Sequence, residues 1–237
     1  MQNKVIYDNN GSNLTFQSYM SKVFAIVGLG LLVSGVVAFA IGMNYITVLN
    51  FLGAFGILGV FLPIILEFVV VIYFSRRLMT MSKQTAYICF FLYSLLTGIS
   101  FAYIFAVYSI GNIAFAFAST TMLFICMSIL GKNTSLDLSK ASSYLFYGLL
   151  GIIISSLLNV LIFKSSTMDL IISYVAVIIF LVLIAYDMQR LRTLYDQGMY
   201  DSELNEKLLI FGSFQLYLDF INLFIRILQI FSRRRND

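Results

Sequence analysis

Long runs of apolar residues, separated by short polar segments, occupy most of this 237-residue chain. A helix needs about 20 mostly apolar residues to cross the hydrocarbon core of a bilayer. Runs of that kind occur at about 23–43, 51–74, 85–108, 112–131, 143–163, 169–190 and 207–231. The pattern therefore predicts an all-α, polytopic membrane protein with seven transmembrane helices.

The same pattern divides the chain into three parts. Residues 1–22 are mostly polar and lack the apolar core of a cleavable signal peptide, so we expect a short cytosolic arm. Residues 23–231 are predicted to form one seven-helix membrane domain, and 232–237 form a basic tail. The short loops, without a retrieval or organelle-targeting signal, favour a bacterial plasma membrane.

Basic residues in the loops predict the orientation. They precede the first predicted span and follow the second, the fourth and the sixth, and the group after the sixth comprises Arg190, Arg192 and Lys207. The loop MNYITVLN between the first two spans has none. Cytosolic loops carry the excess of Lys and Arg, so the N-terminus is predicted to be cytosolic. Seven spans would then place Arg233, Arg234 and Arg235 outside. Either the last segment is re-entrant, or the earlier loops dominate and the three arginines are tolerated outside.

Composition excludes several kinds of chemistry. Sixty per cent of the residues are hydrophobic and only 11% are charged, too few charges to cover a water-soluble domain. The absence of histidine excludes Ser-His hydrolysis and imidazole pH sensing, so sensitivity to protons near neutrality has to come from carboxyl groups. We interpret the net charge of +4 as a feature that orients the chain in the membrane, and we expect no binding of nucleic acid. We expect that this protein is not an enzyme and that it holds no tightly bound cofactor.

Four ionisable residues are predicted at hydrocarbon depth: Glu67, Asp187, Asp219 and Arg226. A charged side chain at the centre of a membrane helix costs about 2.5 to 3.5 kcal/mol on insertion scales. Only a partner or water offsets that cost. Each of the four is therefore a candidate functional residue.

Polar residues in the last predicted span recur at helical spacing. Steps of four, three, four and three residues place them on one helix face. They are Gln215, Asp219, Asn222, Arg226 and Gln229. Because this face cannot contact lipid, we predict that the last helix is central in the bundle and lines a polar pathway. The alternative, an amphipathic helix on the membrane surface, would need more Lys and Arg than the single Arg226.

The two remaining acidic residues allow alternatives. Asp187 lies near the cytosolic end of its span, where it is either hydrated beside Arg190 or part of a buried site. Glu67 follows Pro63, the only proline in the chain, which loosens the helix there. Glu67 either lines the same polar pathway or pairs with Arg226.

Three short segments carry a resemblance to a known family. AYDMQ at 185–189, LYLDFINLF at 216–224 and DLS at 137–139 resemble the Bax inhibitor-one family, and the spacing of spans is similar over nearly the whole chain. The resemblance implies seven helices with the last one surrounded, and a pH-sensitive calcium leak. It also implies that Asp187 and Asp219 share a proton and bind Ca²⁺. An arginine of the second helix, here Arg76 or Arg77, would latch the closed form.

The chemistry of such a pair does not depend on the resemblance. Two carboxyl groups held close where water is scarce cannot both ionise cheaply, so they share one proton. Loss of that proton leaves a dianionic site that attracts an oxygen-seeking cation such as Ca²⁺. We therefore expect Ca²⁺ and H⁺ to compete there. Ca²⁺ is expected as a permeant or bound ion, in a protein whose other partner is the lipid bilayer.

Two other functions use the same carboxyl groups. An intramembrane aspartyl protease also pairs two aspartates of neighbouring helices to activate water. Here, however, the last helix reads LYLD without the glycines of GxGD, and no PAL tripeptide follows. A proton-coupled secondary transporter would be favoured by inverted repeats, and the sequence has no convincing internal repeat.

Overall fold

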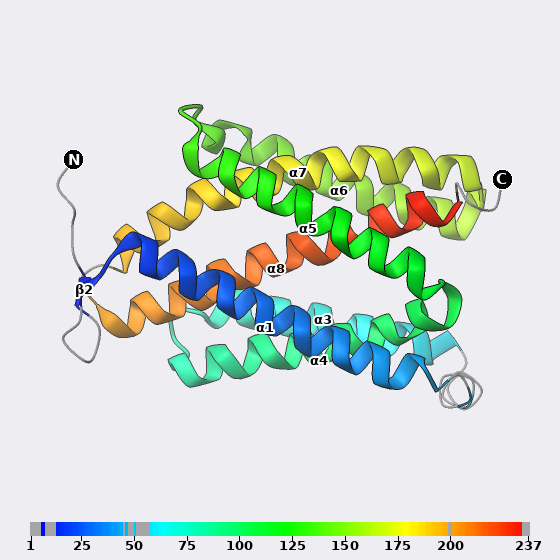
Figure 1. The fold of residues 1–237 in the computed structure, drawn as a ribbon, viewed down its shortest axis with the longest axis horizontal. Coiled ribbons are helices and arrows are strands. Elements are labelled where there is room, and N and C mark those ends of the chain that lie inside the picture. Colours follow the sequence, from blue (N-terminus) through cyan, green and yellow to red (C-terminus); the bar gives the residue numbers. More distant parts are fainter. Residues whose placement is uncertain are drawn as a thin grey trace. The chain divides into compact units, whose positions relative to one another are not determined.

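The computed structural model describes residues 6–7, 13–44, 46, 50, 57–198 and 201–233. Nearly all of them are helical (Figure 1). The helices are α1 (Phe16–Gly42), α3 (Ile57–Arg77), α4 (Lys83–Val107), α5 (Ile110–Asn133), α6 (Ser142–Leu158), α7 (Ser166–Gln197) and α8 (Ser202–Arg233). A 3₁₀ turn, Leu138–Ala141, precedes α6 and a π turn, Asn159–Phe163, follows it. The short strands β1 (Ile6–Tyr7) and β2 (Asn13–Leu14) pair in antiparallel fashion. The prediction of a helical protein is confirmed.

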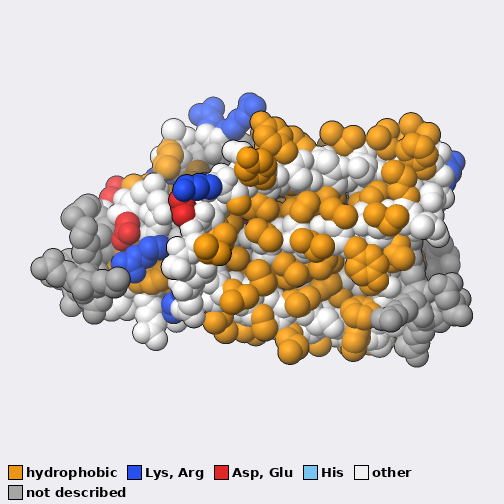
Figure 2. Space-filling view, turned by 90° about the horizontal axis from the view of Figure 1, so that it is seen from above, with side chains coloured by type: hydrophobic (Ala, Val, Ile, Leu, Met, Phe, Trp, Pro, Cys, Tyr) orange, Lys and Arg blue, Asp and Glu red, His pale blue; other side chains and the backbone are white. Residues whose placement is uncertain are grey.

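Six segments of the described residues are long and apolar enough to cross a membrane. They are α1, α4, α5, Leu138–Phe163, α7 and Ser202–Ser232. Large apolar side chains are exposed along them, and hydrophobic side chains cover most of the helical surface in Figure 2. A surface this apolar fits lipid rather than water. The chain is thus an integral membrane protein. Helix α3 is not among the six, and residues 51–56 of the predicted second span lie outside the described residues.

Three helix ends differ from the predicted spans. Helix α1 begins at Phe16, inside the predicted polar arm, because the Thr15 hydroxyl accepts a hydrogen bond from the Ser18 amide and caps the helix. Helix α7 continues past 190 to Gln197, where Leu191, Leu194 and Tyr195 are buried. Helix α8 begins at Ser202, five residues before the predicted start. Hydropathy marks where lipid ends, whereas caps and packing decide where a helix ends.

Residue contacts divide the chain into two compact units. The first comprises Met1–Ser109 and Leu191–Tyr217, and the second comprises Ile110–Arg190 and Leu218–Asp237. Helix α8 contributes its N-terminal half to the first unit and its C-terminal half to the second. It is also the most enclosed of the six candidate spans, with 72% of its apolar window buried against 17–50% in the others.

In the first unit, α1 packs closely on α4 through small residues. A Cβ atom on Gly42 would lie 2.5 Å from the Ala102 carbonyl oxygen, so only glycine allows this approach. The N-terminal half of α8 packs on aromatic rings of α3 and α4. Phe214 contacts Phe74 at 5.0 Å and Tyr93 at 5.0 Å between ring centroids.

In the second unit, α5 buries a single face. Its buried residues recur every three or four positions: Ile113, Ala116, Thr120, Phe124, Ser128 and Gly131. Phe124 contacts Phe220 of α8, with 5.5 Å between ring centroids. Gly131 packs directly against the backbone of Ala185 in α7, leaving no room for a Cβ atom. Helix α5 is therefore held against both α7 and α8, next to the two aspartates that those helices carry.

Candidate functional site

Asp187 and Asp219 meet in the second unit. Asp187 comes from α7 and Asp219 from α8, and only 8% and 6% of their surfaces are exposed. Their side chains are hydrogen-bonded to each other. Because a carboxylate only accepts hydrogen bonds, a bond between two carboxyl groups requires that one of them holds a proton. The burial of Asp187 favours the buried alternative over a hydrated residue, although Arg190 also lies near enough to attract it.

One oxygen of this pair has no partner. Asp219 Oδ2 is inaccessible to solvent and makes no hydrogen bond. A buried oxygen that lacks a donor is costly, and sites of this kind often serve function rather than stability. The pair therefore offers a free acceptor atom to a proton, a hydroxyl group or a cation.

The other polar residues of the last helix lie in different surroundings. Gln215 is half-buried in the first unit. Asn222 donates to the Leu218 carbonyl of its own helix at 2.8 Å. In the second unit, Arg226 donates to Ser156 Oγ of α6 at 3.1 Å and to Gln229 Oε1 at 3.2 Å, and Ser173 of α7 donates to the same Gln229 oxygen. Asn222, Arg226 and Gln229 thus have hydrogen-bond partners within the protein, and a continuous polar pathway along this face stays a prediction.

Glu67 and the two candidate latch residues belong to the first unit. Glu67 accepts a hydrogen bond from Ser100 of α4 at 2.7 Å. This hydrogen bond lowers the cost of placing a carboxyl group within the apolar part of α3. Arg76 and Arg77 are exposed in the last turn of the same helix. Their role as a latch for Asp187 stays a prediction.

Sequence reasoning missed the role of Gln189. Its side chain accepts from the Leu138 amide at 3.1 Å and donates to the Leu136 carbonyl at 2.7 Å. Asp137, between those two residues, caps the 3₁₀ turn, and hydrogen bonds from Ser139 hold the pKa of Asp137 below its usual value. Gln189 thus ties the α5–α6 connection to the turn of α7 that carries Asp187. The only sequence signal is that Gln189 and Asp137 lie in the two short segments AYDMQ and DLS.

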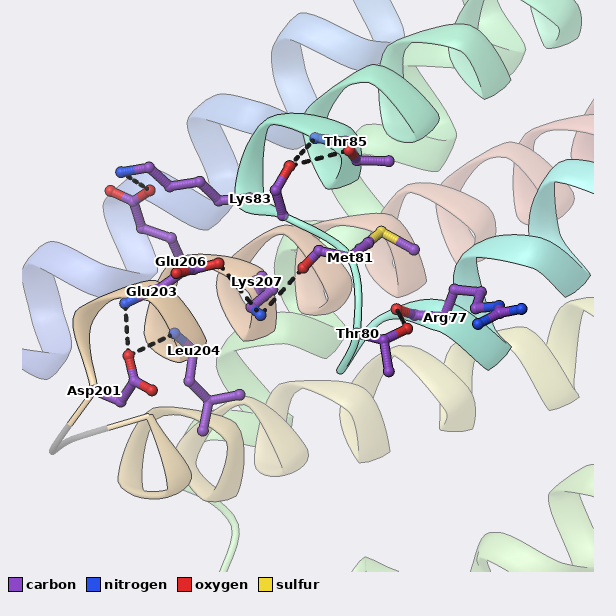
Figure 3. A network of polar contacts seen from close by, with 11 residues as sticks. Arg77, Thr80, Met81, Lys83, Thr85, Asp201, Glu203, Leu204, Glu206 and Lys207 are labelled. Carbon is purple, nitrogen blue, oxygen red and sulfur yellow. Dashed lines mark hydrogen bonds and ion pairs between the residues drawn. The ribbon is translucent and has the colours of Figure 1, made fainter.

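A second missed residue is Lys207, read from the sequence as a loop charge. It lies on α8 with 9% of its surface exposed. Figure 3 shows its amine between two acceptors, the Met81 carbonyl at 3.1 Å and Glu203 at 3.5 Å. Beside it, Lys83 pairs with Glu206 at 3.1 Å, and Asp201 caps the first turn of α8. The connection between α3 and α4 is therefore bound to the start of α8.

The aspartate pair supplies two carboxyl groups, which by themselves do not complete the ligand set of a metal ion. Within the described part of the chain, no group of three or more His, Cys, Asp and Glu side chains is arranged to hold a metal ion. Calcium takes six to eight oxygen ligands, so two carboxyl groups leave several positions to water or other oxygens.

These features define a class: a helical integral membrane protein whose last two helices bury a hydrogen-bonded pair of aspartates. The family model described as Inhibitor of apoptosis-promoting Bax1 matches residues 16–236, and the chain belongs to this Bax inhibitor-1 family. The family predicted from the three short segments is therefore confirmed.

Three similar proteins come from bacteria. An uncharacterized protein of Borreliella burgdorferi is 39% identical over 92% of this chain and 93% of its own length. The inner membrane protein YbhL of Escherichia coli K12 is 37% identical over 92% of this chain and 93% of its own length. An uncharacterized membrane protein of Streptococcus pyogenes serotype M1 is 30% identical over 98% of this chain and 99% of its own length.

Proposed function

We propose that this protein is a pH-sensitive calcium leak channel of a bacterial plasma membrane, in which Asp187 and Asp219 sense protons. The observation that carries the proposal is the hydrogen bond between these two buried carboxyl groups. The proposal includes a seventh span formed by α3 and the segment before it, a central α8 and a cytosolic N-terminus. Family membership and the relative named as an inner membrane protein support the setting.

The proton and calcium compete at this pair. While the pair holds its proton, its net charge is about one negative charge, which attracts a divalent cation only weakly. When pH rises, the proton leaves and two negative charges face each other in a site with little water. Ca²⁺ offsets that repulsion and supplies the partner that Asp219 Oδ2 lacks.

Low pH also acts on the opening of the channel, which is a different step from the binding of Ca²⁺. In the proposed closed form, Arg76 or Arg77 pairs with Asp187. Protonation of Asp187 removes its negative charge and so releases the arginine, which favours the open arrangement of helices. Low pH therefore favours the open pathway while it weakens binding of Ca²⁺ at the pair. Flux is expected to rise as pH falls, until loss of bound Ca²⁺ limits it.

The proposal assigns transport rather than catalysis. An aspartyl protease would need the same pair of carboxyl groups, but family membership offers no support for peptide cleavage. A proton-coupled transporter would move Ca²⁺ against its gradient when a proton gradient is imposed. A leak moves Ca²⁺ only down its own gradient, so the two are separated by the same liposome measurement.

The test uses purified protein in liposomes that contain a calcium-sensitive dye. We expect Ca²⁺ entry that depends on external pH in the wild-type protein, because the carboxyl pair exchanges a proton. Asp219→Asn and Asp187→Asn should each remove the pH dependence. Asp196→Asn is the matched control, because Asp196 is also on α7 but is exposed and paired with Arg192. Flux that is absent at every pH, or unchanged by both substitutions, would refute the proposal.

A further inference from the structure

Hydroxyl groups on helices in nonpolar surroundings usually donate to the carbonyl four residues earlier on the same helix. Most serines and threonines described in the helical core of this protein follow that rule. Bonds of this type are made by Ser34, Ser94, Thr120, Thr121, Ser173 and Ser213. Ser128 departs from the rule: it is only 4% exposed, and its hydroxyl has no hydrogen-bond partner.

One other buried polar atom described in the second unit also lacks a hydrogen-bond partner. Among the described residues of the second unit, two buried side-chain polar atoms make no hydrogen bond, Ser128 Oγ and Asp219 Oδ2. A buried polar atom without a partner is costly, so such atoms are few in folded proteins. Ser128 Oγ and Asp219 Oδ2 can each accept a partner from outside the protein.

The buried face of α5 brings Ser128 toward the aspartates. Ser128 lies four residues after Phe124 and three residues before Gly131 on this face. Phe124 contacts Phe220, which follows Asp219, and Gly131 packs against Ala185, two residues before Asp187. Ser128 is therefore placed between the two contacts that fix α5 beside the pair.

We propose that the Ser128 hydroxyl is the third oxygen ligand of the cation that binds at Asp187 and Asp219. This inference rests on the proposed function of the pair. A hydroxyl oxygen has two lone pairs, so it can coordinate a hard cation without adding charge. The ligand class is a divalent cation that prefers oxygen, with Ca²⁺ as the probe.

The direct test measures Ca²⁺ binding to the purified full-length protein by calorimetry at a pH where the wild type binds. Ser128→Ala should weaken binding about tenfold, the effect of losing one good ligand interaction. Thr120→Val is the matched control, since Thr120 is buried on the same face of α5 but its hydroxyl bonds to the Ala116 carbonyl. Thr120→Val should leave Ca²⁺ affinity within about twofold of the wild type.

A second variant changes the kind of ligand rather than removing it. Ser128→Cys, made in a Cys126→Ser background because Cys126 is exposed, replaces oxygen by a soft sulfur ligand. Sulfur favours Cd²⁺ and disfavours Ca²⁺. We expect this variant to gain Cd²⁺ affinity and lose Ca²⁺ affinity, which a purely structural role for Ser128 would not produce.

The outcomes separate the two proposals. If Ser128→Ala and Ser128→Cys bind Ca²⁺ like the wild type while Asp219→Asn does not bind it, Ser128 is not a ligand and the channel proposal stands. If wild type and Asp219→Asn bind Ca²⁺ equally, both proposals are overturned. Thermal unfolding without Ca²⁺ checks folding, and Ser128→Ala should be no less stable than the wild type, because it removes a buried hydroxyl that has no partner.

Discussion

Each half of α8 buries an ionisable side chain, a lysine in one half and an aspartate in the other, and the two have different surroundings. In the first unit, the Lys207 amine donates to the Met81 carbonyl and pairs with Glu203, so its charge has an acidic partner (Figure 3). In the second unit, Asp219 has Asp187 as its hydrogen-bond partner and keeps one oxygen unpaired. The buried amine has a partner of opposite charge, whereas the buried carboxyl group is held beside a group of the same sign.

This difference separates stability from function. A buried ionisable group with complete partners contributes to folding, and its removal costs stability. A buried group that lacks partners is maintained at a cost, and its neutralisation relieves that cost. The contrast between Lys207 and Asp219 can therefore be tested by the sign of the change in stability.

The largest expected effect comes from Lys207→Met. Methionine keeps an apolar stem of similar length but loses the hydrogen bond to the Met81 carbonyl. We expect a loss of about 2 kcal/mol in the free energy of unfolding, as for a hydrogen bond made by a charged donor. Thermal unfolding in detergent measures it. A variant as stable as the wild type would mean that the Lys207 contacts contribute nothing to stability.

Asp219→Asn should change stability in the other direction. The amide can still hydrogen-bond to Asp187, and it removes the repulsion between two acidic groups. We expect a gain of about 1 kcal/mol at pH 8. Because the folded pair holds a proton, the wild type should also lose stability as pH rises, and this slope should disappear in the variant. Unfolding curves at several pH values measure both, and a clear loss of stability would contradict the comparison.

Gln189→Ala tests the tie between α7 and the α5–α6 connection. It removes two hydrogen bonds to exposed backbone, and we expect a loss of about 1 kcal/mol. Faster hydrogen exchange at the Leu138 amide is the specific measurement, since that amide donates to Gln189. Gln197→Ala, at the exposed end of the same helix, is the control. Equal exchange in both variants would show that Gln189 does not hold the connection.

The smallest effect is expected for Lys83→Ala. The pair of Lys83 and Glu206 is partly exposed, and exposed ion pairs contribute little to stability. Salt screens such pairs, so the difference from the wild type should shrink as ionic strength rises. Unfolding at low and high salt measures it. An effect as large as that of Lys207→Met would remove the distinction between buried and exposed contacts in this network.

Much of the fold could be predicted from the sequence. Hydropathy locates helices because each apolar run has to satisfy its own backbone hydrogen bonds in lipid. The spacing of Gln215 and Asp219 identifies the enclosed helix for the same physical reason. The short segments around Asp187 and Asp219 identified the family, and the structure places these two side chains together.

Other features depend on contacts that no local pattern encodes. Lys207 reads as a loop charge because its acceptor, the Met81 carbonyl, is more than a hundred residues away in the chain. Ser128 is indistinguishable from Thr120 in sequence, since both are hydroxyl residues in an apolar run. Only the structure shows that one hydroxyl is bonded to its own helix and the other is free.

The length of α7 provides a position at which a probe of helix movement can be attached. Its 32 residues extend about 48 Å at 1.5 Å per residue, well beyond the roughly 30 Å of hydrocarbon in a bilayer. The helix that carries Asp187 is therefore longer than the hydrocarbon layer, and Thr193 near its C-terminal end is exposed. A spectroscopic label attached at Thr193 would report movement of this end of the helix during acidification, without replacing any acidic residue.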